Sequence, residues 1–386
     1  MSARLLTKPL VDAAWLIPRI GESHLRILDC SLYLPAMGRD AKAEFGASRI
    51  PGATFFDIDA ASDPDAAFPH TLSSASHFEA YMAGLGLNND DDIVVYDGAG
   101  LFSAARAWWM LRHFGHQSVA VLDGGMPQYL RAGGKVDTSP GDADTALGGG
   151  TFVASDSNGF GVCDLQAVRN NALADASTRR PVMDARSSGR FLGTASEPRA
   201  GLPSGAVPHS LSVPFDSLLH PEHRTFLPSD QLRATFTAAG YDPTSEMGAQ
   251  APIFTCGSGL TACIVGLGAQ LAFEDAPPPT VYDGSWTEYS TAVMLPATEQ
   301  LQTQLEALLS DSSSIADIQE AGVAELQKAV TLLGEVKASQ ASGHVLAALG
   351  TSKDGHDLRD RCRTVAMEIQ GPDFDEAKWR ATFGLA

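Results

Sequence analysis

Cysteine is scarce in this chain, and its few copies follow no recognisable spacing. Five cysteines are spread over 386 residues, without the short paired intervals of a zinc site or the density of a disulfide framework. Their distribution argues against a disulfide-stapled scaffold and favours free thiols in a reducing compartment. No motif indicates a metal ion, and we expect neither a metal nor another resident cofactor.

Positive charge is also in short supply. Lysine and arginine together number 27 against 46 aspartates and glutamates, which leaves a net charge of −19. That balance argues against nucleic acid or an anionic membrane surface as a partner, and an anionic substrate would need locally placed basic residues.

Long apolar runs are missing as well. No stretch is long enough to span a bilayer, and the first twelve residues lack the apolar core of a secretory signal. We therefore expect no membrane partner and a cytoplasmic location, with a mitochondrial one as the alternative.

The most informative feature present is an internal repeat. Four segments recur at a spacing of roughly 155 to 160 residues. The pairs are Leu28–Ser31 with Met183–Arg186, Ile50–Ala53 with Val207–Ser210, Ile93–Gly98 with Pro252–Gly257, and Leu122–Gly125 with Tyr282–Trp286. Strands alternate with helices in both copies, which predicts two α/β domains with parallel sheets.

The repeat sets the expected domain boundaries. We predict a first domain over residues 1–137, whose first helix begins at Val11, and a second over residues 159–295. A Gly-, Asp- and Thr-rich linker over residues 138–158 joins them. Residues 296–386 have no counterpart in the repeat, and we expect them to form a small α+β domain whose role the sequence does not indicate.

One loop carries the chemistry. Ile253–Thr255 is predicted as a buried strand, and an apolar helix is predicted from Thr261 to about Phe273. Between them lies Cys256-Gly257-Ser258-Gly259-Leu260, whose N–H groups and following helix would favour the thiolate, the nucleophilic form of cysteine. A buried strand-end thiol is the alternative interpretation.

The first copy carries Asp97 where the second has Cys256. We therefore expect the second domain to be catalytic, and the first to be a scaffold that lends residues to a site between the two.

Taken together, these segments resemble the rhodanese-type sulfurtransferases, and within them the enzymes that act on 3-mercaptopyruvate. The resemblance covers residues 8 to about 295. It is carried by the Cys256 loop and by the segments Arg49–Asp59, Ser103–Trp109 with Arg106, Leu122–Gly125, Gly189–Arg199 and Tyr282–Trp286.

The resemblance implies a fold of two tandem rhodanese-like domains and a two-step sulfur transfer. The Cys256 thiolate would take the substrate's sulfur as a persulfide, and pyruvate would leave. An acceptor would then remove that sulfur: a thiol such as thioredoxin or a small thiol, or cyanide.

The resemblance also assigns roles to other residues. Ser258, helped by His70 and Asp59, would polarise the substrate carbonyl. Arg190 and Arg199 would bind the substrate carboxylate, a task suited to a fork-shaped cation. The N–H groups of the loop, at Gly257, Gly259, Leu260 and Thr261, would stabilise the anionic sulfur.

The Cys256 loop also bears on competing functions. Thiosulfate is a dianion, and relatives that use it place cations in this loop, whereas residues 257–262 carry none. A phosphatase of the Cys-x5-Arg kind is excluded, because Ala262 stands where the arginine would be. A non-catalytic interaction module would lack a cysteine at this position, and a serine hydrolase using Ser258 would place that serine in a Gly-x-Ser-x-Gly turn. The thiosulfate enzyme, the interaction module and the hydrolase remain less favoured hypotheses.

Two assignments stay open at the level of residues. Asp63 and His77 are the alternative to Asp59 and His70, because the sequence around His70 departs from the family pattern. Cys263 is expected to be a buried packing residue, with a role as a resolving thiol as the alternative.

Overall fold

The computed structural model describes residues 6–140, 148–155, 157, 159–243, 248 and 250–294. The α+β domain predicted over residues 296–386 lies outside them. Contacts divide the chain into two compact units, the first being Met1–Arg186 with Leu211–Ser285 and the second Ser187–Ser210 with Trp286–Ala386. Both sheets belong to the first unit.

Each half of the chain contains a five-stranded, fully parallel sheet. The first has the order β1-β5-β4-β2-β3, with β1 Leu10–Val11, β2 Leu25–Asp29, β3 Ala53–Phe55, β4 Asp92–Tyr96 and β5 Val119–Leu122. The second has the order β6-β10-β9-β7-β8, with β6 Val162–Cys163, β7 Val182–Asp184, β8 Leu211–Ser212, β9 Ile253–Thr255 and β10 Thr280–Tyr282. The two orders are identical when each half is counted from its own first strand, so the predicted duplication and the α/β class are confirmed.

Helices follow the strands in both halves. The first half contains α1 Ala13–Leu16, α2 Ala41–Ala47, α3 Ile58–Ala61, α4 Ala75–Gly84, α5 Ala104–His113 and α6 Gly125–Arg131. The second contains α7 Leu165–Leu173, α8 Ser188–Phe191, α9 Ser229–Ala238, α10 Ala262–Ala272 and α11 Ser285–Tyr289. Single turns of 3-10 helix cover Ile17–Arg19, Pro35–Met37 and Phe215–Leu218, and Ser290–Met294 is π-helical.

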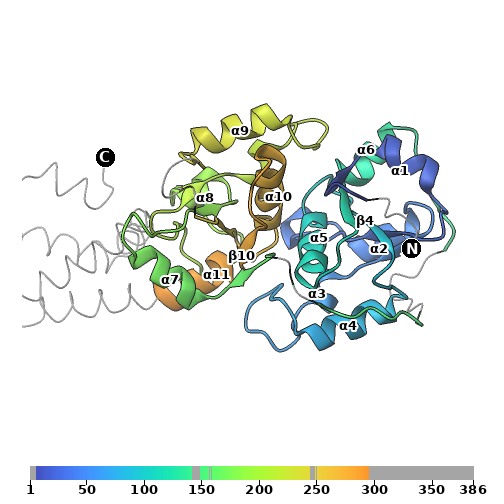
Figure 1. Cartoon of the computed structure of the whole chain (residues 1–386), viewed down its shortest axis with the longest axis horizontal. Helices are drawn as coiled ribbons and strands as arrows, with labels where there is room; N and C mark the ends of the chain where they lie inside the picture. The colour runs from blue at the N-terminus through green and yellow to red at the C-terminus, as the bar shows by residue number, and fades with distance from the viewer. Residues whose placement is uncertain are drawn as a thin grey trace, which may run out of the picture. The chain divides into compact units, whose positions relative to one another are not determined.

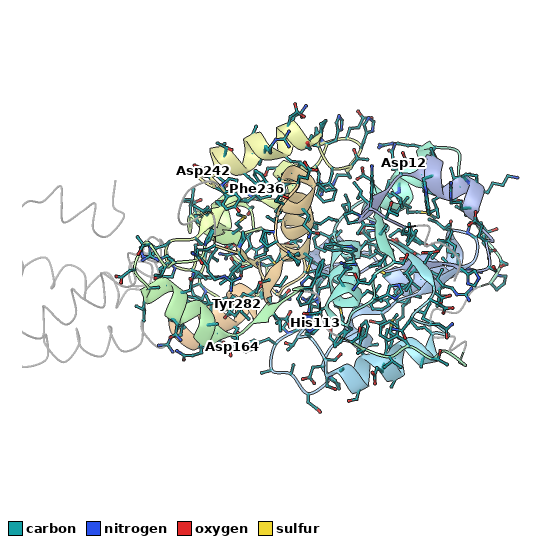
Figure 2. All side chains as sticks on the ribbon, viewed as in Figure 1. Asp12, His113, Asp164, Phe236, Asp242 and Tyr282 are labelled. Atoms are coloured by element: carbon teal, nitrogen blue, oxygen red, sulfur yellow. The ribbon has the colours of Figure 1, made fainter. Side chains whose placement is uncertain are left out.

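The two halves also begin alike. In each, a two-residue strand is followed by an aspartate that caps the first helix, Asp12 before α1 and Asp164 before α7 (Figure 2). Their carboxylates accept the N–H groups of Trp15 at 2.7 Å and Ala167 at 2.8 Å. The prediction that the helix begins at Val11 is wrong: Val11 lies in β1, because the aspartate fixes the helix start two residues later.

One hydrophobic core joins the two halves. Helices α5 and α10 pack against each other (Figure 1). A single cluster of buried side chains includes residues beside both sheets. Trp108 of α5 meets Phe160 edge to face at 5.4 Å between ring centroids, and Trp109 donates its indole N–H to Pro279 O. The first half is therefore packed directly against the elements that carry the Cys256 loop.

The segment predicted as a linker is anchored where it is described. Phe152 is buried against Phe78, and Ser155 donates its N–H to Phe114 O. These contacts tie residues 152–155 to the first half.

Candidate active site

Cys256 follows β9 directly, at the carboxyl end of a central strand, and the loop after it leads into α10. Its side chain is buried. Ser285 Oγ organises the loop by accepting the N–H groups of Cys256 at 3.2 Å and Gly259 at 3.0 Å, and it donates to Tyr282 O. One hydroxyl thus fixes the two ends of a tight turn.

Gly259 is required at its position for two reasons. Its φ is +76°, in the left-handed region that side chains rarely adopt. A Cβ there would also lie 2.9 Å from Asp283 Oδ1 and 3.1 Å from Arg106 Nη1. The absent side chain lets a charged pair approach the loop closely.

The structure brings three of the predicted residues together. His70 Nδ1 lies 3.0 Å from Ser258 Oγ, within hydrogen-bond distance, although these residues come from different halves. His70 Nε2 lies 3.5 Å from Asp59 Oδ1, beyond an ordinary hydrogen bond, and the Asp59 side chain is 67% exposed. Ser258 and His70 therefore form a tight buried contact, which Asp59 joins more loosely.

The alternative pair lies elsewhere. His77, on α4, donates its Nε2–H to the carbonyl of Ala60 at 2.8 Å. Asp63 accepts the N–H of Asp65 at 3.0 Å. Of the two histidines that the sequence left open, His70 is the one beside Ser258.

A buried arginine connects the same two loops. Arg106 of α5 is completely buried and forms an ion pair with Asp283, with 2.7 Å between Nη1 and Oδ1. Its Nη2 donates to His70 O at 2.6 Å and its Nη1 to Gly259 O at 3.3 Å. The desolvation caused by burial opposes the charge on Arg106, yet the nearby Asp283 carboxylate keeps its pKa above the ordinary value.

A second buried ion pair lies at the end of β7. Arg186 donates Nε to Asp184 Oδ1 at 3.0 Å and Nη2 to Asp184 Oδ2 at 2.6 Å. Asp184 pairs in register with Thr255, the residue before Cys256. The pair therefore stands at the same sheet edge as the nucleophile.

The two arginines predicted to bind a carboxylate belong to the second unit. Arg190, on α8, donates Nε and Nη2 to Glu197 Oε2 at 3.1 and 2.5 Å. Arg199 lies in the loop that follows, half-buried. Their predicted role stays a prediction.

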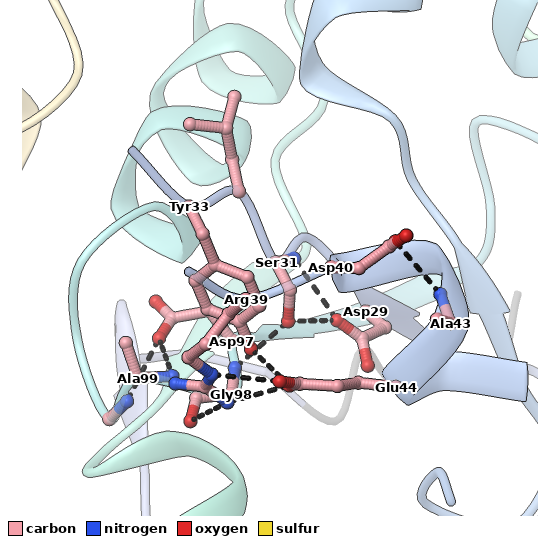
Figure 3. Close-up of polar contacts among 12 residues, drawn as sticks. Asp29, Ser31, Tyr33, Arg39, Asp40, Ala43, Glu44, Asp97, Gly98 and Ala99 are labelled. Atoms are coloured by element: carbon pink, nitrogen blue, oxygen red, sulfur yellow. Dashed lines mark hydrogen bonds and ion pairs between the residues drawn. The ribbon is translucent and has the colours of Figure 1, made fainter. Parts of the chain in front are cut away.

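The corresponding loop of the first half shows what such a turn can hold. Asp97 Oδ1 accepts the N–H groups of Ala99 and Gly100, and Oδ2 accepts those of three residues at the start of α5, namely Phe102, Ser103 and Ala104. Figure 3 shows the Asp97 carboxylate in the turn with Gly98 and Ala99, near Ser31. The turn between a central strand and its helix is therefore an anion cradle, filled in this half by the chain's own carboxylate.

Cys263 is placed to pack rather than to react. It is completely buried in α10, and its thiol donates to Gly259 O. Burial raises the pKa of Cys263 to about 12, so it remains a thiol near neutral pH. Among the residues that the structure describes, no three His, Cys, Asp or Glu side chains gather to hold a metal ion.

The sequence alone predicts no role for four of these residues: Arg106, Arg186, Asp283 and Ser285. All four lie in segments that carry the repeat or the family resemblance, and this is the one feature of the sequence that points to them. Their roles depend on contacts between distant parts of the chain, and the residue spacing within a segment does not reveal those contacts.

The comparisons with known proteins agree with this architecture. The sequence model of the rhodanese-like domain matches residues 12–132. The 3-mercaptopyruvate sulfurtransferase of Rattus norvegicus is 39% identical over 297 residues, covering 75% of this chain and 94% of the relative. The mitochondrial thiosulfate/3-mercaptopyruvate sulfurtransferase 1 of Arabidopsis thaliana is 38% identical over 309 residues, covering 75% and 78%.

A solved structure agrees as well. The crystal structure of the Escherichia coli 3-mercaptopyruvate sulfotransferase SseA is similar with a TM-score of 0.62 at 33% identity, covering 72% of this chain and 99% of that one. In the part of the chain that the structure describes, no helix is long and apolar enough to cross a membrane. By its duplicated fold and by these relatives, the chain belongs to the family of rhodanese-like sulfurtransferases.

Proposed function

We propose that this chain transfers sulfur from 3-mercaptopyruvate to a thiol or to cyanide through a persulfide on Cys256. The observation that carries the proposal is the buried Cys256 loop, free of cationic side chains over residues 257–262, with Ser258 3.0 Å from His70. Sulfur transfer from a thiol-bearing keto acid needs a nucleophile for the sulfur, which Cys256 supplies. It also needs a polar group beside the carbonyl oxygen, which Ser258 and His70 supply.

The first half-reaction exchanges one bond for another. The Cys256 thiolate forms an S–S bond with the substrate sulfur, and the substrate's C–S bond breaks. Its electron pair stays on the carbon fragment, which leaves as the enolate of pyruvate and then takes a proton on carbon. In the second half-reaction an acceptor thiolate attacks the outer sulfur, and the electron pair of the S–S bond returns to Cys256.

Ser258 and His70 act on the oxygen where charge develops. If His70 donates its Nδ1–H to Ser258 Oγ, the serine's own hydrogen is directed at the substrate carbonyl oxygen. Hydrogen bonds to that oxygen strengthen as the enolate forms, which lowers the barrier more than it tightens substrate binding. Asp59 lies more loosely beside Nε2, at 3.5 Å.

Anionic groups need donors of their own. For the substrate carboxylate we propose Arg190 and Arg199, on the strength of the sequence motif. For the anionic sulfur we propose the loop N–H groups of Gly257, Leu260 and Thr261, by analogy with the filled cradle around Asp97. Gly259 would contribute through its conformation, since its own N–H donates to Ser285.

Thiosulfate is the second candidate donor, because the Arabidopsis relative is named for both substrates. Its two negative charges are less well suited to a loop without a cation. The acceptor is expected to be thioredoxin, a small thiol or cyanide, and the location cytoplasmic, with a mitochondrial one as the alternative.

The test compares the two sulfur donors and identifies the residue to which the transferred sulfur becomes attached. Purified protein is mixed with 3-mercaptopyruvate or thiosulfate without an acceptor, and intact-mass measurement and peptide mapping look for one added sulfur atom. We expect the adduct on Cys256, formed faster from 3-mercaptopyruvate, and steady pyruvate release once cyanide is added. Cys256→Ser should abolish both, whereas Cys163→Ser, a half-buried cysteine outside the loop, should change neither. Pyruvate release that persists in Cys256→Ser would refute the proposal.

A further inference from the structure

The buried ion pair Arg106–Asp283 makes hydrogen bonds to the loops that carry His70 and Ser258. We propose that Arg106 and Asp283 are positioning residues that hold the His70 loop in place over Ser258. This inference deepens the proposed function and rests on it, because it acts through the role proposed for His70.

The first observation is the geometry of one guanidinium. Arg106 donates to the backbone carbonyl of His70 from one half and to the carbonyl of Gly259 from the other, while its charge is paired with Asp283. Gly259 is the residue after Ser258. One rigid side chain therefore fixes the distance between the loop that carries the histidine and the loop that carries the serine and Cys256.

The second observation is a matching contact from the other partner. Asp283 Oδ2 accepts the N–H of Leu72 at 2.5 Å, two residues beyond His70. The pair thus holds the His70 loop at two points, at a carbonyl through Arg106 and at an N–H through Asp283. Both contacts are to backbone, so they fix the course of the chain around His70.

The third observation explains why a clamp is needed. His70 has a φ of +62°, in the left-handed region, which is costly for a residue with a side chain. Such a conformation is unfavourable for a residue with a side chain and persists only where the surrounding contacts hold it. The contacts of Arg106 and Asp283 hold His70 in this conformation. Without them the loop would relax and carry the imidazole away from Ser258.

Lysine cannot replace this arginine. The planar guanidinium presents several donors in a fixed fork, whereas an ammonium on a flexible stem cannot reach two carbonyls and a carboxylate in the same geometry. Arg106→Lys keeps the positive charge beside Asp283 and removes the fork. It is therefore the milder probe of positioning, because it avoids leaving Asp283 as an uncompensated buried charge.

The decisive experiment is a double-mutant cycle. Steady-state pyruvate release from 3-mercaptopyruvate is measured for wild type, Arg106→Lys, His70→Asn and the double variant, asparagine being chosen because it tolerates a left-handed backbone. We expect Arg106→Lys to lower kcat by about 10- to 100-fold with KM changed less than about twofold. In the His70→Asn background the same change should cost less than about twofold. An equal loss in both backgrounds would overturn the inference, since Arg106 would then act independently of His70.

A matched control separates positioning from loss of stability. Arg49 also pairs with a carboxylate, Asp137, and donates to a backbone carbonyl, that of Ser139, within the first half. Arg49→Lys should lower the melting temperature and leave kcat unchanged. If Arg106→Lys does not yield folded protein, Asp283→Glu, which keeps both charges and displaces the oxygen from Leu72, enters the same cycle with the same expectations.

A second readout is independent of turnover. In the resting protein, the ¹⁵N chemical shift of His70 Nδ1, assigned with His70→Asn, reports its hydrogen bond to Ser258. We expect Arg106→Lys to move this resonance toward that of a solvent-exposed imidazole, while Arg49→Lys leaves it in place; an unmoved resonance contradicts the inference. Wild-type protein that releases no pyruvate would refute the proposed function alone, because the resonance still tests the clamp.

Discussion

Two polar side chains are expected to affect different kinetic constants. Arg190 is proposed to bind the substrate carboxylate in ground state and transition state alike, so its removal should raise KM. A charge-assisted hydrogen bond contributes about 1.5–3 kcal/mol, which corresponds to a rise of roughly 10- to 100-fold. Ser258→Ala, which removes a contact that strengthens only as the enolate forms, should mainly lower kcat.

The arginine variant needs a compensating change. Arg190→Ala takes a cation away from the buried Glu197 carboxylate, so it is combined with Glu197→Gln, and Glu197→Gln alone is the control. Initial rates across 3-mercaptopyruvate concentrations give both constants. Similar KM values for the Arg190 and Ser258 variants would remove the carboxylate role.

Asp29 gives a prediction about pH. It is buried at the end of β2, and burial raises its pKa to about 6. The unfolded chain has a pKa near 3.9, so the folded protein holds this proton more tightly. The contribution of Asp29 to the free energy of unfolding should therefore be greatest below about pH 4 and fall by about 3 kcal/mol as the pH rises past 6.

The measurement is a difference between variants. Urea unfolding of wild type and Asp29→Asn is followed from pH 4 to 7.5. The variant should gain stability relative to wild type as the pH rises, because asparagine has no proton to lose. Asp90→Asn, on the exposed surface of the same half, should show no such trend. A flat difference between wild type and Asp29→Asn would mean that Asp29 ionises in the folded protein as easily as in the unfolded one.

At the scale of elements, the strand–loop–helix unit occurs twice with different occupants. Asp97 places one carboxylate among five backbone N–H groups. Asp97→Ala should destabilise the protein by several kcal/mol, since each buried donor left unsatisfied costs about 1–3 kcal/mol and water can satisfy some of them. It should also open the cradle to a small anion.

Thermal melts with and without sulfate test this. Sulfate should raise the melting temperature of Asp97→Ala well beyond its effect on wild type, because the ion binds the folded state. Asp40→Ala removes the cap of α2, where the carboxylate accepts the N–H of Ala43, and should show no specific rescue. The same response to sulfate in all three proteins would contradict the idea that the loop itself binds anions.

Much of this architecture could be predicted from sequence, because local signals and the repeat agreed. Ile253–Thr255 is the strand that its apolar run predicted, and α10 begins one residue after the expected Thr261. The two-residue strand Leu10–Val11 was not predicted. It forms by pairing with β5 in the assembled sheet, and no short sequence pattern predicts that pairing.

In the candidate site, too, the residues of a continuous motif could be predicted, whereas the long-range contacts could not. Cys256 and Ser258 were predicted from one continuous motif. The resemblance favoured His70 and left His77 open as the alternative, and the fold shows that the His70 loop is the one that meets Ser258. The role of Arg106 is harder still to recognise: its segment resembles the family, but its partners Gly259 and Asp283 lie in the other half of the chain. Such long-range contacts become visible only once the sheets are assembled.

At the scale of the whole molecule, the two sheets should unfold together. A continuous core beside both sheets, including the contact between Trp108 and Phe160, would be exposed if the halves separated. Separation would also break the buried ion pair between Arg106 and Asp283, which come from different halves. Neither half should therefore have a stable state of its own within the chain.

Native-state hydrogen exchange measures this directly. Amides of β4 and of β9, the central strands of the two sheets, should exchange with the same free energy and the same dependence on denaturant, because one global opening exposes both. Arg106→Lys should lower both values equally, even though the substitution lies in the first half. If β9 instead exchanged through a separate opening of lower free energy, with β4 still protected, the halves would be independent folding units and their shared core would not govern stability.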